Sequence, residues 1–128
     1  MKDLITNFES FLKSELLYSD PKNLYQPVKY ILESGGKRLR PLITMSISDI
    51  LSNDSKKALP ASASLEIFHN FTLAHDDIMD NSLMRRGKET IHSKWDINTG
   101  ILSGDVMLII SYEFLKKYDD VIYLELSK

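Results

Sequence analysis

The sequence predicts an all-α fold, and three of its features support that prediction. Glycine and proline are scarce, with 5 and 4 copies among 128 residues, so few positions interrupt a helix. No long stretch alternates between apolar and polar residues as a half-buried strand does. Apolar residues recur instead at spacings of three and four, which gather them on one face of a helix.

Two helices are expected before residue 37. The first should end near Leu17, ahead of the polar stretch YSDPKN at 18–23, and has one apolar face. That face consists of Leu4, Phe8, Phe11 and Leu12. The second carries Val28, Ile31 and Leu32 on one side, and its Pro27 is tolerated only near a helix start. Gly35 and Gly36 should end it.

The rest of the chain predicts three further long helices, at about 41–51, 56–80 and 101–118. The polar segment 81–90 should be a loop, followed by a short helix around 91–95. The last long helix is apolar nearly all round, so it should be buried on several sides. The helices expected here are too few to surround it, and others should come from a later part of the protein or from a partner.

Composition narrows the class of protein. Hydrophobic residues make up 43% and charged residues 27%, as in a soluble globular protein. The formal net charge of −2 argues against broad electrostatic binding to nucleic acid. The absence of cysteine excludes disulfides and cysteine-ligated metals. The N-terminal pattern contains acidic residues, unlike a secretory signal, and no apolar stretch is long enough to span a bilayer. We therefore expect a cytoplasmic protein without a transmembrane segment.

Three carboxylates crowd the end of the fourth predicted helix, in HDDIMD at 75–80. Asp76 and Asp80 share a face, His69 points the same way two turns earlier, and Asp77 is turned roughly 100° aside. Like charges at this spacing repel, and the helix dipole disfavours them, unless a divalent cation lies between them. Mg²⁺ fits the pair better than zinc does. Taken alone, the pattern also fits a solvated acidic helix end.

Two basic clusters accompany these carboxylates. GGKRLRP at 35–41 places Lys37 and Arg40 behind two glycines, which let backbone N–H groups approach an anion. MRRG at 84–87 offers two adjacent arginines. Each cluster alone also fits surface cations beside a helix end or a loop. Together with the carboxylates they predict sites for two diphosphates, one bound through metal ions and one bound directly by cations.

Three segments in this order resemble the trans-type polyprenyl (isoprenyl) diphosphate synthases: GGKRLRP at 35–41, EIFHNFTLAHDDIMDNSLMRRG at 66–87 and ILSGDVML at 101–108. The resemblance extends from about Tyr25 to Tyr118. It implies an all-α fold of antiparallel helices around a central cavity, of the isoprenoid synthase type. Residues 1–128 would form the N-terminal portion of one such domain.

The resemblance also implies the reaction, a head-to-tail condensation of isopentenyl diphosphate with an allylic diphosphate through a Mg²⁺-assisted allylic carbocation. Asp76, Asp77 and Asp80 would be catalytic, with Asp76 and Asp80 as the Mg²⁺ ligands. Arg85 would contact the allylic diphosphate. Isopentenyl diphosphate would be held by Lys37, Arg40, His69 and Arg86. A homodimer is expected.

Product length follows from the same resemblance. In this family, bulky residues just before the aspartate motif form the floor of the product cavity. Phe71 and Thr72 occupy these positions, and a single aromatic resembles enzymes with short products of about C15–C20. Helical geometry does not place Phe71 on the face of Asp76, and Phe71 also fits an ordinary core position.

Family members carry a second aspartate-rich motif on a later helix, and these residues do not supply it. The paired aspartates of YDDVIY at 118–123 lack a third carboxylate at the required spacing, so this segment should be a loop and a helix start. We expect the 128 residues alone to lack prenyltransferase activity. Mg²⁺-dependent turnover by the purified chain would contradict that expectation.

Three other functions are weighed. A non-catalytic small subunit of a heteromeric prenyltransferase would co-purify with a longer homologue, but it need not keep Asp76, Asp80 and Arg85. A class I terpene cyclase shares an aspartate-rich motif, but it would not need a second basic site with Lys37 and His69. A nucleic-acid-binding module fits least, given the net charge.

Overall fold

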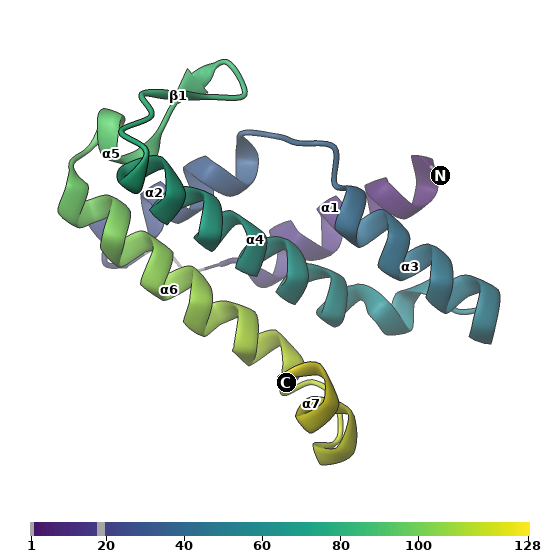
Figure 1. Ribbon diagram of the computed structural model, residues 1–128. Helices are drawn as coiled ribbons and strands as arrows, with labels where there is room; N and C mark the ends of the chain where they lie inside the picture. Colours follow the sequence, from purple (N-terminus) through teal and green to yellow (C-terminus); the bar gives the residue numbers. More distant parts are fainter. Residues whose placement is uncertain (1, 18–19) are drawn as a thin grey trace. The chain divides into compact units, whose positions relative to one another are not determined.

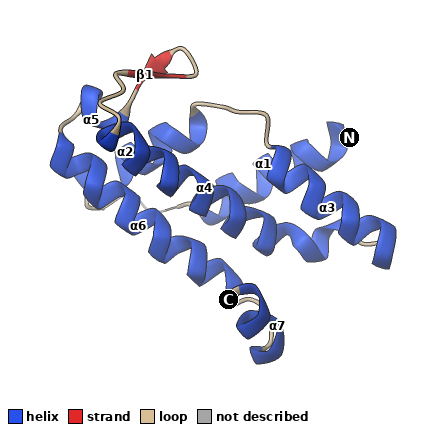
Figure 2. Cartoon of the chain, viewed as in Figure 1, coloured by secondary structure: helices blue, strands red, loops and turns tan. Residues whose placement is uncertain are grey.

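The structure is a computed structural model that describes residues 2–17 and 20–128. Helices make up most of it, and strands occur among the described residues only in one short hairpin (Figure 1, Figure 2). The predicted all-α class is therefore confirmed. The stretch predicted to break the first helix includes Tyr18 and Ser19, which lie outside the described residues. No helix in the described ranges is both long enough and apolar enough to cross a membrane.

The chain divides into two compact units. Among the described residues, the first unit contains 2–17, 38–66 and 110–128, and the second contains 20–37 and 67–109. Two long helices contribute to both units: α4 (Leu59–Met79) and α6 (Ile97–Leu115).

The first unit packs α1 against α3. Its own elements are α1 (Lys2–Glu15), α3 (Leu39–Ser52), the 3₁₀ turn η1 (Ser55–Ala58) and α7 (Asp120–Leu126). Phe8 and Met45 are fully buried, and Leu12 is nearly so. The ring of Phe11 lies 5.9 Å from that of Phe114, centroid to centroid. The apolar face predicted for the first helix is therefore the face that α1 buries.

A buried arginine joins three elements of the first unit. Arg38 Nε donates to Glu9 Oε1 at 2.7 Å, and Arg38 Nη1 donates to Glu66 Oε1 at 3.3 Å. Arg38 is only 5% exposed, and its backbone is left-handed, with φ 49°. An arginine adopts this conformation only where surrounding contacts impose it. The ion pairs with α1 and α4 supply such contacts and fix the start of α3.

Helix ends differ from the prediction by a few residues. The first helix ends at Glu15 rather than near Leu17, and the last long helix is α6, at Ile97–Leu115 rather than 101–118. Beyond Leu115 the chain tightens into i→i+3 hydrogen bonds. There the Tyr118 hydroxyl donates to the carbonyl of Lys57 at 2.7 Å and accepts from the Ala61 N–H at 3.0 Å. Burial raises the pKa of Tyr118 above its ordinary value.

The second unit holds α2 (Lys22–Glu33), the hairpin strands β1 (Met84–Arg85) and β2 (Lys88–Glu89), and α5 (Ile91–Lys94). The segment predicted as a loop is thus partly a hairpin, with Met84 opposite Glu89 and Arg85 opposite Lys88. Arg86 and Gly87 turn the chain with φ values of 54° and 75°. Two consecutive positive φ angles match the twist of paired strands, which explains why a two-residue turn closes here.

Large apolar side chains of α6 remain exposed, as its all-round apolar pattern and the few expected neighbours predicted. Five of them are between 39% and 60% exposed: Ile97, Ile101, Leu102, Ile109 and Tyr112.

Two glycines let α6 approach α4 closely within the second unit. A Cβ at Gly104 would overlap the His75 ring, and one at Gly100 would lie 2.8 Å from Ile78 Cδ1. His75 Nε2 also lies 3.0 Å from the carbonyl oxygen of Ile101 and 3.8 Å from Asp105 Oδ1. The His75 ring therefore lies directly against α6, which limits its movement on that side.

Gly104→Ala should destabilise the protein, although alanine is the better helix former by about 1 kcal/mol. We expect a net loss of about 1–3 kcal/mol in the free energy of unfolding, measured by urea denaturation, because the methyl group meets a fixed ring. Gly100→Ala should cost less, since the end of the flexible Ile78 side chain can move. In a His75→Ala background, Gly104→Ala should no longer destabilise. Stabilisation by Gly104→Ala in the otherwise unchanged protein would contradict this close packing.

Candidate active site

The structure gathers nearly all the predicted site residues in the second unit. These are Lys37, His69, Phe71, Thr72, Asp76, Asp77, Asp80, Arg85 and Arg86. Arg40 lies on α3 in the first unit, and its side chain is exposed.

The three aspartates at the end of α4 have different surroundings. Asp76 and Asp80 are exposed, and the Asp80 N–H donates to the Asp76 carbonyl at 2.8 Å, so helical spacing continues through Asp80. Asp77 is only 3% exposed. The motif therefore presents two carboxylates to solvent and turns one into the protein, in line with the angle predicted from helical geometry.

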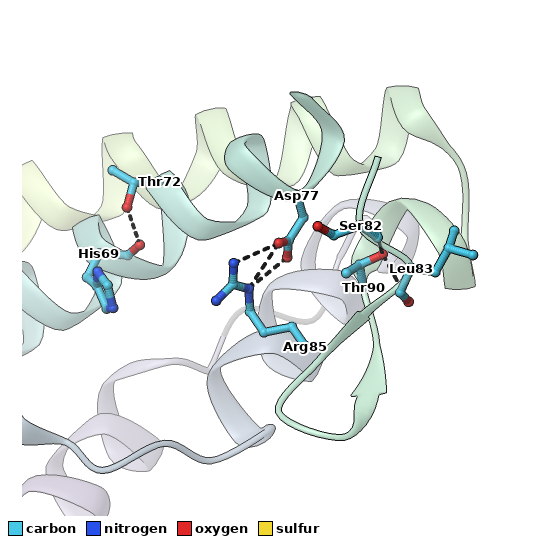
Figure 3. Close-up of polar contacts among 7 residues, drawn as sticks. All are labelled: His69, Thr72, Asp77, Ser82, Leu83, Arg85 and Thr90. Atoms are coloured by element: carbon cyan, nitrogen blue, oxygen red, sulfur yellow. Dashed lines mark hydrogen bonds and ion pairs between the residues drawn. The ribbon is translucent and has the colours of Figure 1, made fainter. Parts of the chain in front are cut away.

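Asp77 and Arg85 form a bidentate ion pair (Figure 3). Arg85 Nε lies 2.9 Å from Asp77 Oδ2, and Arg85 Nη2 lies 2.8 Å from Asp77 Oδ1. These hydrogen bonds raise the pKa of Arg85 above its ordinary value. Partial burial opposes that rise, while the charges of Asp77, Asp76 and Asp80 add to it. Arg85 therefore belongs to one electrostatic cluster with all three aspartates, and its side chain remains 34% exposed.

Further hydrogen bonds hold the hairpin in place. Thr90 Oγ1 donates to the Ser82 carbonyl at 2.9 Å, and the Thr90 N–H donates to the Leu83 carbonyl at 3.0 Å (Figure 3). The Tyr30 hydroxyl, from α2, donates to the carbonyl of Glu89 at 2.9 Å. These hydrogen bonds hold the hairpin at its base and along β2, and they therefore fix the backbone position of Arg85.

Tyr30 and Thr90 are the site-supporting residues that sequence reasoning missed. Both act through hydrogen bonds to backbone carbonyls far away in the sequence or across a turn, and such bonds leave no periodic pattern. The one signal for the hairpin was Gly87, which readily adopts one of the two positive φ angles of such a turn, and it is weak because Arg86 is not a residue that favours the other.

The basic cluster GGKRLRP meets the hairpin at Gly35 and Gly36. Gly35 and Gly36 have φ values of 88° and 129°, which only glycine adopts readily. Arg86 Nη1 donates to the Gly35 carbonyl at 2.7 Å. Lys37 follows directly and is exposed. The structure therefore connects the two sequence motifs, GGKRLRP and MRRG, through a direct contact.

A shallow pocket lies under the hairpin, with an empty volume of about 290 Å³ that includes open solvent. Its lining includes Tyr30, Ser34, Asp77, Arg85 and Arg86. Both arginines and the buried aspartate thus border one depression in the surface of the second unit.

The residues ahead of the aspartates form an aromatic row on α4. The Phe71 ring, half-buried, lies 5.3 Å from the Phe68 ring and 5.0 Å from the His75 ring. Thr72 Oγ1 donates to the His69 carbonyl at 2.6 Å (Figure 3), so its hydroxyl is bound within the helix. Phe71 therefore belongs to an aromatic cluster, while Thr72 and His69 are linked through the helix backbone.

The carboxylates suit a metal ion that is shared with a ligand. Within the described ranges, no group of three or more His, Asp and Glu side chains is arranged to hold a metal ion. The exposed pair of Asp76 and Asp80 fits Mg²⁺, which often takes one or two carboxylates and completes its shell with phosphate oxygens and water. A closed site built from protein ligands alone, as structural zinc requires, does not fit these residues.

Arg85→Met should destabilise the protein, because it leaves the buried Asp77 carboxylate without its guanidinium. We expect a loss of about 2–4 kcal/mol in the free energy of unfolding, below the value for a fully buried pair because Arg85 is partly solvated. Lys88→Met on the facing strand, which removes an exposed cation, should change it by less than about 0.5 kcal/mol. Equal effects of the two substitutions in urea denaturation would rule out a structural role for the ion pair.

Comparison with known proteins gives the chain a family. Residues 21–128 match the family model described as Polyprenyl synthetase. The chain is 43% identical over 111 residues to the geranylgeranyl pyrophosphate synthase of Geoglobus acetivorans, covering 87% of this chain and 34% of that protein. It is 42% identical over 113 residues to the geranylgeranyl diphosphate synthase of Saccharolobus solfataricus, covering 88% and 34% respectively.

A solved structure of a geranylgeranyl pyrophosphate synthase matches the fold with a TM-score of 0.90 and 53% identity. The match covers 93% of this chain and 36% of that one. The chain thus spans about a third of the length of the relatives it matches. With both its sequence and its all-α fold matched along most of its length, the chain belongs to the polyprenyl synthetase family.

Proposed function

We propose that this chain provides substrate-binding residues of a prenyltransferase that condenses isopentenyl diphosphate head-to-tail with an allylic diphosphate. One observation carries the proposal: Arg85 is held by Asp77 beside the exposed pair of Asp76 and Asp80. A fixed, partly solvated cation next to two free carboxylates suits a diphosphate that is bound both directly and through metal ions.

Each charged group has a role in this proposal. Arg85 binds the allylic diphosphate and stabilises the charge that it gains when the allylic C–O bond breaks. Mg²⁺, bound through Asp76 and Asp80, would add Lewis-acid stabilisation of the same charge. Asp77 holds Arg85 in place and so supports catalysis without binding metal. The second substrate, isopentenyl diphosphate, is held by Lys37, Arg40, His69 and Arg86.

The new C–C bond forms after the allylic diphosphate ionises. Ionisation gives an allylic cation and free diphosphate. The isopentenyl double bond then attacks the cation carbon to form the new C–C bond, and transfer of a proton to the released diphosphate restores a double bond. The cation must be shielded from water, which the apolar surfaces of α4 and α6 would help to exclude.

A short product, of about C15–C20, is part of the proposal. It rests on the single aromatic Phe71 ahead of the motif and on the names of relatives such as the geranylgeranyl diphosphate synthases. The aromatic row of Phe68, Phe71 and His75 supports a bulky barrier at this level of α4. Phe71 and Thr72 are proposed to limit chain length together.

We further propose a cytoplasmic homodimer in which residues 1–128 form the N-terminal portion of one isoprenyl diphosphate synthase domain. The exposed apolar residues of α6 support the need for further helices against it, from the same polypeptide or from a second copy.

The test uses the protein expressed from its complete reading frame. Asp76→Ala should lower kcat about a hundredfold or more and raise the Mg²⁺ requirement, because metal stabilisation of the leaving group contributes several kcal/mol. Lys37→Ala should raise KM for isopentenyl diphosphate about tenfold, the loss of one charge-assisted hydrogen bond. The KM for the allylic substrate should stay nearly constant in Lys37→Ala.

Two exposed residues away from the site serve as matched controls. Asp49→Ala and Lys22→Ala remove the same kinds of charge and should leave steady-state kinetics unchanged. The site assignment is wrong if neither Asp76→Ala nor Lys37→Ala moves its parameter.

A further inference from the structure

The guanidinium of Arg86 lies against the glycine turn in a way that goes beyond a simple surface cation. Its Nη1 donates to the Gly35 carbonyl at 2.7 Å. A Cβ at Gly36 would lie 3.1 Å from Arg86 Cζ, 3.2 Å from Nη1 and 3.3 Å from Nη2. The guanidinium therefore lies against Gly36, where an added Cβ would crowd it and force it to shift by a few tenths of an ångström.

Arg86 itself is held in an unusual backbone conformation. Its φ of 54° is left-handed, at the first position of the hairpin turn. Such a conformation costs about 1–3 kcal/mol for a residue other than glycine and persists only where the surroundings fix it. The hairpin is fixed on both sides, since Arg85 binds Asp77 on α4 and Glu89 accepts from Tyr30 on α2. Arg86 therefore reaches the glycine turn from a rigid base.

We propose that Arg86 is a positioning residue that fastens the Gly35–Gly36 turn to the β1–β2 hairpin and thereby fixes where Lys37 holds the second diphosphate. The inference rests on the proposed function, in which Lys37 and Arg86 bind isopentenyl diphosphate. It adds that Arg86 orders the Lys37 side of that site before any ligand arrives.

The two glycines that precede Lys37 explain why its position needs a restraint. Glycine loses more conformational entropy on ordering than any other residue. A turn of this kind samples many conformations unless a contact restrains it. The Arg86 guanidinium supplies a planar, hydrogen-bonded restraint, which a lysine ammonium could not reproduce.

Arg86 variants alone cannot test the proposal, because they also remove a ligand of the diphosphate. Gly36→Ala disturbs the contact while leaving the arginine and its charge in place. It should raise KM for isopentenyl diphosphate about tenfold, with kcat and the KM of the allylic substrate changing less than about twofold. In an Arg86→Lys background, Gly36→Ala should raise that KM by a clearly smaller factor, about threefold or less, because the narrower ammonium no longer meets the added methyl and only the strain of alanine at a φ of 129° remains.

Gly35→Ala is the matched control. It introduces a methyl at another glycine with positive φ, 88°, but that methyl would meet no atom within 4 Å. Its effect on KM should therefore depend less on the Arg86→Lys change than that of Gly36→Ala does, because its methyl does not meet the guanidinium, although the Gly35 carbonyl accepts from Arg86. Circular dichroism of each variant shows whether it is folded before kinetics are compared.

A second measurement does not depend on activity. Amide hydrogen exchange at Gly36 and Lys37 should speed up at least about fivefold in Arg86→Lys relative to the unchanged protein, because the turn loses its restraint. Exchange in α2 should stay the same. Unchanged exchange at the turn, or additive effects of Gly36→Ala and Arg86→Lys on KM, overturns the positioning role.

The two proposals fail in different ways. A protein that is folded but neither binds nor consumes isopentenyl diphosphate refutes the proposed function, while the exchange comparison still decides whether Arg86 restrains the turn. A protein with normal prenyl transfer, whose turn exchanges equally fast with arginine or lysine at position 86, keeps the function and refutes the positioning role.

Discussion

The bidentate ion pair between Asp77 and Arg85 is the contact on which the arrangement of the site depends. It joins the end of α4 to the hairpin through two short hydrogen bonds. A carboxylate as buried as Asp77 is energetically costly unless a cation pairs with it. If the hairpin moved away from α4, Asp77 would be left as an unpaired buried charge. Such a pair contributes little net stability compared with an apolar substitute, but its bidentate geometry ties the hairpin to the end of α4. The position of the hairpin determines where both arginines of MRRG lie. Through Arg86 it also determines where the glycine turn lies.

Helical geometry places the three aspartates in different surroundings. Asp77 points into the protein and neutralises Arg85, while Asp76 and Asp80 remain at the surface with their charges close together. The repulsion between these two, and their unfavourable place at a helix C-terminus, persist until a cation reaches them. In the proposed function, this repulsion favours the binding of Mg²⁺ and a diphosphate together. The turn of roughly 100° between adjacent residues is what makes this division possible.

What the sequence could predict was local, and what it missed depends on contacts between distant residues. The helical period identified the buried face of α1, the long α4 and the separation of Asp77 from Asp76 and Asp80. The hairpin was missed because its two-residue strands are too short to show a period of two, and because its turn places an arginine at positive φ. The contact of Arg86 with Gly35 spans 51 residues, and no spacing rule predicts a bond to a backbone carbonyl at that distance.

The basic motif GGKRLRP and the acidic motif HDDIMD each contain one buried charge among exposed ones, which their composition does not reveal. GGKRLRP reads as a uniform basic cluster, yet Arg38 is buried against Glu9 and Glu66 while Lys37 and Arg40 are exposed. The acidic motif behaves alike, since one charge is buried in an ion pair and its neighbours face solvent. In each case the buried charge needs its ion-pair partners close by, and this need restrains the backbone that carries the exposed charges. A run of like charges in a sequence is therefore only a candidate binding motif, and the fold separates its solvent-exposed charges from the charge that is buried in an ion pair.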